Sequence, residues 1–334
     1  MIHELKDIVY SSYYAQQQQI KTVLISVVGL NGSSYRKPGV RMLLWENDKM
    51  IGAISGGCVE KEMIRQAQSV FKSGHSKVIE YDGRFRLGCE GVLKILIEPF
   101  HVNQEQLDQF QIVLDKREII TIESYYSEQS SLMGKSGSLI FSQEDSIYGK
   151  PFTFNLSFEK YQQTLSPEFQ LFIFGAEHDA KALCQFAALT GWNVQIIDTL
   201  KGTADVTDFS GAKNLIRLNE DDIHQLCIDE HTAIVVMTHS FVKDLAYLLQ
   251  LHQKKFAYLG VLGAKKRIGK LMDQMIEFNP TIDTEFLDAI HSPCGLDIGS
   301  ITPQEISISI IAEIISVCRG KVPNSLSYKA LNNA

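Results

Sequence analysis

Two cysteines in glycine-rich settings are the residues of this sequence best suited to chemistry. Cys58 follows Gly56 and Gly57 at the start of a helical pattern, and Cys89 lies between two glycines just before an apolar run. The partial positive charge at a helix start lowers the pKa of a thiol and favours the thiolate, which attacks electrophiles and binds metals. The pair is therefore expected to bind one soft ligand or to transfer sulfur. The alternatives are a buried structural cysteine at position 58 and a β-bulge around position 89.

A second candidate site is a cluster of hydroxyl and basic side chains in residues 32–41. It holds Ser34, Arg36, Lys37 and Arg41 in and just after a Gly/Pro-containing loop. Hydroxyls, backbone N–H groups and guanidinium groups are the donors that a phosphate or a pterin-like ligand requires. The sequence therefore predicts an anion site in this segment, with a solvated turn as the alternative.

The segment that begins near residue 170 matches the opening of a dinucleotide-binding fold, in which G-x-G-x-x-G/A follows the first strand. Gly175 and Ala180 fit this pattern, and Asp198 fits the acid that is expected about 20 residues later for the ribose. Glu177 stands at the middle glycine, where its carboxylate would repel a pyrophosphate. The sequence thus favours the fold and argues against ordinary NAD(P) binding.

Further polar residues follow the strands that are expected in the second half of the chain. His239 comes directly after an apolar run, and Arg267 belongs to a basic group that opens a helix against its dipole. Open α/β sheets bind ligands at the carboxyl ends of their strands, so His178, Asp198 and His239 are candidates for that crevice. Arg267 is a candidate for contact with an anion. Capping of the next helix is the alternative for His239.

The elements that position these residues fall into two blocks with different sequence patterns. Residues 1–100 predict an α+β domain with strands, a hairpin and one amphipathic helix over 59–74, which ends at Gly74. Residues 101–168 form a connecting region with short strands. From 169 to 334, apolar strands alternate with helices, which predicts a Rossmann-like, doubly wound parallel sheet and an α/β fold class. The predicted strands are 170–176, 193–199, 232–238 and 255–263, and the predicted helices are 178–190, 240–252 and 265–276.

Composition excludes several broad classes of protein. The 334 residues are 45% hydrophobic and 21% charged, which is typical of globular chains, and the net charge of -7 argues against a general nucleic-acid binder. The sequence lacks a long apolar run and a secretory signal, so we expect a cytoplasmic protein with no membrane span. Six scattered cysteines without a C-x-x-C motif argue against a disulfide framework and a structural zinc site.

Taken in order, these motifs resemble the xanthine dehydrogenase accessory protein family, also called the XdhC/CoxI family. The first block contributes GSSYRKPGVRML, GAISGGCVEKE and LGCEGVLKILIEP, and the second contributes FIFGAEHDAKAL, VQIIDT, VVMTHSFVKD, YLGVLGAKKR and HSPCGLDIGSITPQEISISIIAEI. The resemblance covers nearly the whole chain. The chain departs from the usual family pattern at Glu177, where a glycine is common, and at Cys294, where an aliphatic residue is common.

The resemblance implies a chaperone that binds the molybdenum cofactor and delivers its sulfurated form to a xanthine dehydrogenase-type molybdenum hydroxylase. It also implies a homodimer, transient contact with a cysteine desulfurase, and no catalytic turnover. Cys58 and Cys89 then become candidates to contact the molybdenum or its sulfur, and Arg36, Lys37 and Arg41 become candidates for the pterin phosphate. The predicted cofactor-binding residues are Cys58, Cys89, Gly56, Gly57, Ser34, Arg36, Lys37, Arg41, Gly175, His178, Asp198, His239 and Arg267.

Two other functions stay open at this point. The doubly wound domain favours an NAD(P)-dependent oxidoreductase, which Glu177 opposes. A thiol protein that carries a persulfide on Cys58 would transfer sulfur without binding molybdenum.

Overall fold

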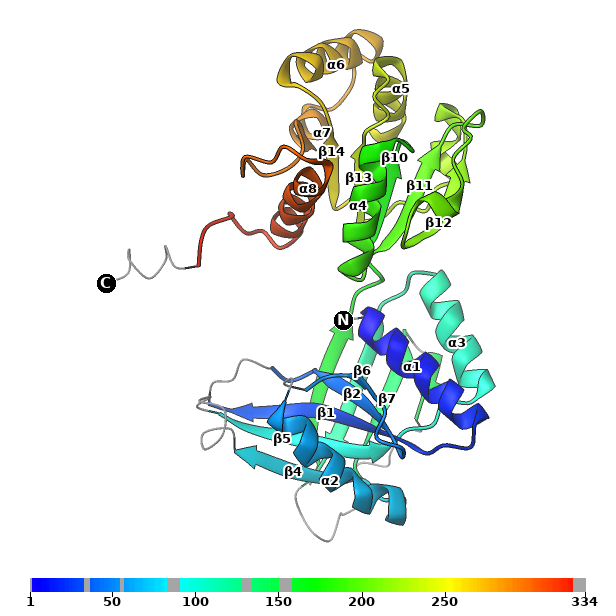
Figure 1. Cartoon of the computed structure of the whole chain (residues 1–334), viewed down its shortest axis with the longest axis vertical. Helices are drawn as coiled ribbons and strands as arrows, with labels where there is room; N and C mark the ends of the chain where they lie inside the picture. The colour runs from blue at the N-terminus through cyan, green and yellow to red at the C-terminus, as the bar shows by residue number, and fades with distance from the viewer. Residues whose placement is uncertain are drawn as a thin grey trace, which may run out of the picture. The chain divides into compact units, whose positions relative to one another are not determined.

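The structure of the protein is a computed structural model, and it describes residues 2–32, 37–54, 57–82, 91–127, 134–143, 145–149 and 158–326. The chain forms two units, Met1–Pro167 and Glu168–Ala334 (Figure 1).

The N-terminal unit contains a five-stranded antiparallel sheet in the order β3-β2-β1-β5-β4. Its strands are β1 (Thr22–Asn31), β2 (Arg41–Trp45), β3 (Met50–Gly52), β4 (Lys77–Asp82) and β5 (Val92–Pro99). The predicted hairpin is present as β2 and β3. The central strand β1 is buried over most of its length, because both faces of the sheet are covered.

Helix α2 (Cys58–Ser73) covers one face of this sheet. Its apolar side chains, among them Met63 and Val70, pack against Ile25 of β1. The helix ends at Gly74, which has a φ of 68° and whose N–H donates to the carbonyl of Val70. The amphipathic pattern and the glycine cap predicted this helix to within one residue at each end.

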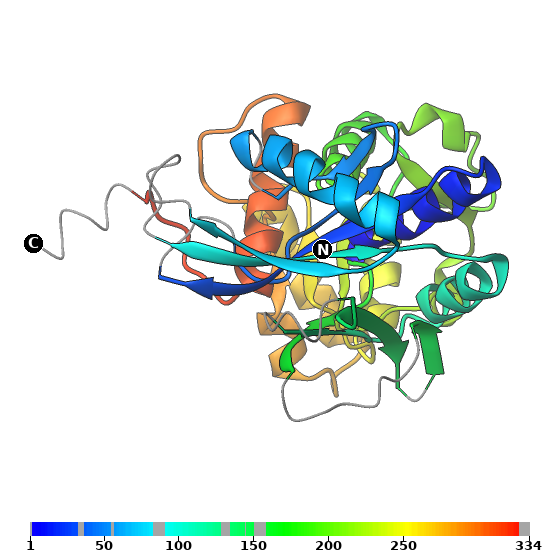
Figure 2. The ribbon, with the colours of Figure 1, turned by 90° about the horizontal axis from the view of Figure 1, so that it is seen from below.

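The other face packs against α1, α3 and a second sheet. Helices α1 (Ile2–Gln17) and α3 (Gln104–Asp115) share a core with Leu24 of β1 and Leu43 of β2. The second sheet is antiparallel, with the order β8-β7-β6-β9, and Figure 2 shows its green strands and the light-blue α2 on opposite sides of β1. Its strands are β6 (Ile120–Tyr126), β7 (Gly137–Ser142), β8 (Asp145–Tyr148) and β9 (Glu159–Leu165).

The C-terminal unit is a six-stranded parallel sheet in the order β12-β11-β10-β13-β14-β15. The chain enters at the centre, proceeds to one edge, and then crosses to the other side, so the topological switch point lies between β10 and β13. The strands are β10 (Gln170–Phe174), β11 (Asn193–Asp198), β12 (Ala212–Arg217), β13 (Thr232–Val236), β14 (Tyr258–Val261) and β15 (Ile290–His291).

Helices cover both faces of this parallel sheet. Ile173 of β10 faces a core shared with α4 (His178–Leu189) and α8 (Pro303–Cys318), and Phe174 faces the opposite core with α5 (Phe241–Leu251), α6 (Lys265–Phe278) and α7 (Thr284–Asp288). This arrangement confirms the predicted α/β class and the doubly wound sheet. Among the described helices, none has the length and apolarity needed to cross a membrane.

Candidate functional site

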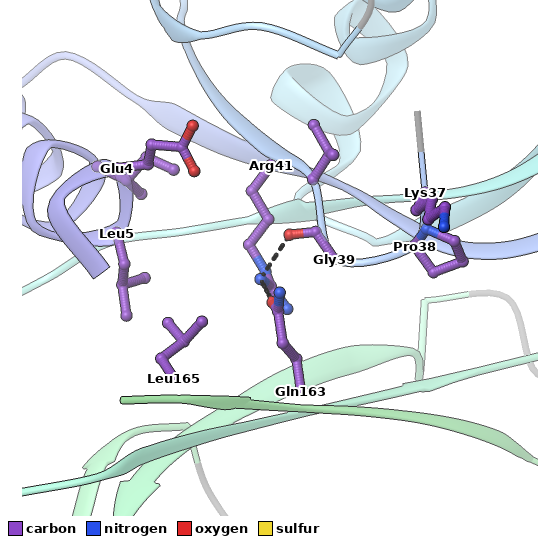
Figure 3. A pocket seen from close by; sticks show the side chains of 10 residues that line it. Glu4, Leu5, Lys37, Pro38, Gly39, Arg41, Gln163 and Leu165 are labelled. Atoms are coloured by element: carbon purple, nitrogen blue, oxygen red, sulfur yellow. Dashed lines mark hydrogen bonds between the residues drawn. The ribbon is translucent and has the colours of Figure 1, made fainter. Parts of the chain in front are cut away.

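The N-terminal unit contains a cavity of about 150 Å³ between α1, the loop before β2, and β9. Glu4, Lys37, Arg41 and Gln163 are its polar lining residues, and we call it the Arg41 cavity (Figure 3). The structure therefore brings together Lys37 and Arg41, two of the residues that the sequence predicts for an anion.

The guanidinium of Arg41 is the most unusual group of this cavity. Its Nη1 donates to the carbonyl of Gly39 (2.9 Å) and to Oε1 of Gln163, as the dashed lines of Figure 3 show. Its Nε and Nη2 are buried and have no hydrogen-bond partner among the described residues. Burial lowers the pKa of Arg41 to about 10, so the group is still a cation at neutral pH. A buried cation with unused donors can accept an anionic ligand.

Local backbone geometry fixes this placement. Arg41 is the first residue of β2 and pairs with Ser26 of β1, so both side chains lie on the interior face. Gly39 has a φ of 99°, and a Cβ at this position would lie 2.5 Å from Nε2 of Gln163. Glycine is therefore required for the loop to approach β9 closely. The Oγ of Ser26 is also buried without a partner among the described residues.

Glu98 of β5 is a functional candidate that the sequence reasoning missed. Its carboxylate is buried and accepts hydrogen bonds from the Ser138 hydroxyl (2.6 Å) and the Ser138 backbone N–H (2.8 Å). Burial raises the pKa of Glu98 to about 7, although Ser138 and the nearby charge of Arg41 act in the opposite direction. A glutamate inside the apolar run VLKILIEPF is the sequence signal that could have found it.

The remaining predicted residues of the N-terminal unit are only partly described. Ser34, Arg36, Gly56 and Cys89 lie outside the described residues, and so does the side chain of Cys58. The backbone of Cys58 begins α2, as the sequence predicts, and Gly57 has open space where a Cβ would stand. The N–H of Gly57 donates to the Glu60 carboxylate (2.5 Å), which satisfies a backbone donor at the start of this helix.

In the C-terminal unit, the loop after β10 has the close packing of a dinucleotide-binding fold. Gly175 has a φ of 125°, and a Cβ there would lie 2.6 Å from the carbonyl oxygen of Met237. Glu177 is the N-cap residue of α4, so an acidic residue begins the helix whose N-terminus would face a pyrophosphate in this fold. The carboxylate of Asp198 accepts from the N–H of Thr199 (2.7 Å) and lies against Gly202. Both contacts are within the turn that directly follows β11.

The predicted histidine and arginine of this unit have partners from neighbouring elements. His239 has a φ of 57° and its Nε2 lies 3.5 Å from Oδ2 of Asp179, across the switch point. Arg267 donates to Asp244 (2.6 Å), which is fully buried and also accepts from the Thr238 hydroxyl. The cation at the start of α6 therefore has a carboxylate partner. Its contact with a ligand anion stays a prediction.

A buried network that the sequence did not reveal fixes the loop after β15. Glu313 of α8 accepts from the Tyr258 hydroxyl (2.5 Å) and from the N–H of Gly295 (2.8 Å). The His291 ring stacks on Tyr258 at 4.7 Å, and its Nδ1 lies 3.7 Å from the Glu313 carboxylate. Burial raises the pKa of the neighbouring Cys294 to about 12, which keeps this thiol protonated and unreactive.

Metal-ligand side chains do not cluster within the described part of the chain. No group of three or more histidine, cysteine, aspartate or glutamate side chains there could hold a metal ion. The side chains of the predicted metal contacts, Cys58 and Cys89, lie outside the described part of the chain.

Comparison with known proteins defines the class. The family model of the XdhC and CoxI family matches residues 15–82, and the model of the XdhC Rossmann domain matches residues 171–314. The chain therefore belongs to the XdhC/CoxI family, as the ordered motifs predicted.

Three particular relatives match along most of the chain. A Bacillus subtilis protein, named as a probable xanthine dehydrogenase subunit, is 28% identical over 90% of this chain and 94% of its own length. The molybdenum cofactor insertion chaperone PaoD of Escherichia coli is 24% identical over 88% of this chain and 83% of its own. A crystal structure of a xanthine dehydrogenase from Bacillus halodurans has a TM-score of 0.75 and 25% identity, and covers 97% of this chain and 99% of its own.

Proposed function

We propose that this protein binds the molybdenum cofactor and supports its insertion into a xanthine dehydrogenase-type molybdenum hydroxylase. The observation that carries the proposal is the meeting of Lys37 and the buried Arg41 at one cavity. The pterin of the cofactor bears a phosphate, and a buried guanidinium with unused donors is suited to that group. The likeness to a cofactor insertion chaperone over 88% of this chain supports the same function.

The finer steps of the proposal assign roles to the two cysteines. Cys58 and Cys89 contact the molybdenum or its sulfur, since thiolates are soft ligands. A cysteine desulfurase supplies the sulfur, and a homodimer in the cytoplasm delivers the sulfurated cofactor to the hydroxylase. The position of Cys58 at the first residue of α2 supports its part, because a helix start favours the thiolate.

Cofactor retention tests this function directly. The purified full chain is incubated with freshly released molybdenum cofactor under anaerobic, reducing conditions, gel-filtered, and assayed for co-eluting molybdenum and pterin fluorescence. We expect near-stoichiometric retention, which Cys58→Ala or Cys89→Ala abolishes. Cys227→Ala is the matched control, because Cys227 is an exposed thiol of the C-terminal unit.

The outcomes separate the candidate functions. If the wild type retains no cofactor, the protein does not deliver it. If sulfur from a desulfurase accumulates on Cys58 while molybdenum is absent, the persulfide carrier replaces the cofactor chaperone.

A further inference from the structure

We propose that Gln163 is an exchangeable cover of the Arg41 cavity, and that a phosphate group binds Arg41 by displacing the Gln163 amide. This inference rests on the proposed function for the identity of the natural ligand, the phosphate of the cofactor. The anion site itself depends only on the residues of the cavity.

Arg41 has unmet hydrogen-bonding capacity in this cavity. A guanidinium presents five N–H donors in a planar fork, which matches the oxygens of a phosphate. Here only Nη1 has acceptors among the described residues, while Nε and Nη2 have none. A buried donor without an acceptor destabilises the folded state, and a charged one does so more strongly. A ligand that brings several oxygens would satisfy the edge of the guanidinium that the protein leaves unused.

The Gln163 amide occupies Nη1, one of the two nitrogens at the end of the guanidinium, so a phosphate that binds Nη1 and the unused Nη2 together must displace it. Oε1 of Gln163 accepts from Nη1 of Arg41, and the amide lies so close to Gly39 that no Cβ could stand between them (Figure 3). The amide offers one neutral acceptor oxygen, whereas a phosphate brings several anionic oxygens that can form two parallel hydrogen bonds with a guanidinium. The side chain of Gln163, in the C-terminal half of β9, is only half-buried, so it can rotate out when an anion arrives.

The size and charge of the cavity limit what it can hold. A volume of about 150 Å³ is below the ~300–1,000 Å³ of sites that enclose a whole small-molecule ligand. The cavity therefore holds one end of a ligand. Lys37 and Arg41 contribute positive charge, and Glu4 is the acidic side chain on the wall. These dimensions and this charge suit a terminal phosphate group better than an apolar ring.

A charge change at position 163 provides a sharp test. Gln163→Glu keeps the shape of the side chain and supplies an internal carboxylate to Arg41, so it should exclude the ligand. Gln162→Glu adds the same charge to the neighbouring, exposed position on the opposite face of β9. Inorganic phosphate is titrated by calorimetry into the full chain, without cofactor, for the wild type and both variants.

We expect Gln163→Glu to weaken phosphate binding by roughly tenfold or more, because it removes charge-assisted hydrogen bonds. Gln162→Glu should change the affinity by less than about twofold, which is the scale of an exposed, screened charge. Gln163→Ala should bind phosphate at least as tightly as the wild type, because the competing amide is gone. Arg41→Met should abolish binding, with circular dichroism confirming that the variant is folded.

Several results would overturn the inference. If Gln163→Ala loses binding as Gln163→Glu does, Gln163 is itself a ligand and not a cover. If folded wild-type protein binds no phosphate at millimolar concentration, the site does not exist. If the wild type, Gln163→Glu and Arg41→Met retain the cofactor equally, the anion site is wrong while the proposed function stands. Phosphate binding without any cofactor retention would instead support the anion site and contradict the proposed function.

Discussion

Two arginines, one in each unit, show how differently a folded chain can treat the same side chain. Both were predicted to bind an anion, and both donate hydrogen bonds to groups of the protein itself. Arg267 donates to Asp244, whose side chain is 0% exposed, and lies over the ring of Phe241. Arg41 has only neutral acceptors, the Gly39 carbonyl and the Gln163 amide, and two of its nitrogens have none among the described residues.

The difference teaches that a basic residue at a suitable place in a fold does not by itself define an anion site. The charge of Arg267 is balanced inside the protein, and its start-of-helix position is explained by Asp244 on the neighbouring helix α5. The carboxylates of Glu98 and Glu4 favour the charged form of Arg41 only through longer-range attraction, and burial raises the pKa of the Glu98 carboxyl to about 7. The N-terminal cavity is therefore the stronger candidate for a bound anion.

The largest expected effect concerns Arg267 and Asp244, the pair whose charges balance each other. Arg267→Met leaves the carboxylate of Asp244 buried without its counter-ion, so it should lower the free energy of unfolding by about 3–5 kcal/mol. Urea denaturation of the full chain measures this loss. Lys266→Met, at an exposed neighbour, should stay within about 0.5 kcal/mol of the wild type. Equal stability of the two variants would mean that Thr238 alone satisfies Asp244, and the contrast between the arginines would disappear.

The next effect depends on pH and comes from Glu98. Its folded-state pKa of about 7 lies above the ordinary 4.5, so the folded protein binds this proton more tightly than the unfolded chain does. The resulting stabilisation is fully present below pH 4.5 and is lost as pH rises through 7. Relative to Glu98→Gln, the wild type should therefore lose about 2–3 kcal/mol of unfolding free energy between pH 5 and pH 8. Denaturation of both proteins across this range measures it. Parallel pH profiles would show that the carboxyl is ionised throughout.

A smaller effect is expected when Arg41 is removed. Arg41→Met replaces a buried cation that has no carboxylate within ion-pair distance among the described residues, so the free energy of unfolding should change by less than about 1 kcal/mol. The same urea experiment used for Arg267→Met gives the comparison. A loss as large as that of Arg267→Met would show that Arg41 has a structural partner, and would remove the reason to expect a ligand.

Much of the fold could be predicted because its signals are local. Apolar runs such as 232–238 and the cap at Gly74 depend on neighbours in sequence, and the parallel sheet follows from strands that alternate with helices. The second sheet of the N-terminal unit was less evident, since strands such as β9 are mostly polar and exposed. Their role depends on pairing with β6, a long-range contact that a local pattern does not encode.

The site was only partly predictable for the same reason. Lys37 and Arg41 are visible as a basic cluster in the sequence. Gln163 and Glu98 are distant from that cluster along the chain and reach it through β9 and β5. The partner of Arg267 was equally hidden, because Asp244 lies 23 residues earlier on another helix. Residue type and spacing thus identified candidates, while tertiary contacts determined which of them has a balanced charge.

The smallest expected effect is a pH dependence of anion binding at Arg41, measured with sulfate. Sulfate stays a dianion between pH 6 and pH 8, so any change in its binding over this range comes from the protein. Arg41 of β2, with a pKa of about 10, remains a cation throughout, whereas Glu98 of β5 gains a negative charge as pH rises through 7. Ser138 of β7 and Tyr148 of β8 are the other polar groups near Glu98, and burial raises the pKa of Tyr148 so that it stays neutral.

Sulfate affinity should therefore fall several-fold from pH 6 to pH 8 in the wild type, because the ionised Glu98 repels the anion. In Glu98→Gln the affinity should be independent of pH, and at pH 8 it should exceed that of the wild type. Calorimetric titrations at both pH values measure the four affinities. A pH dependence that persists in Glu98→Gln would assign the titration to another group. A flat wild-type profile would mean that Glu98 and the bound anion are too far apart to interact, and Arg41 would then act with Lys37 alone.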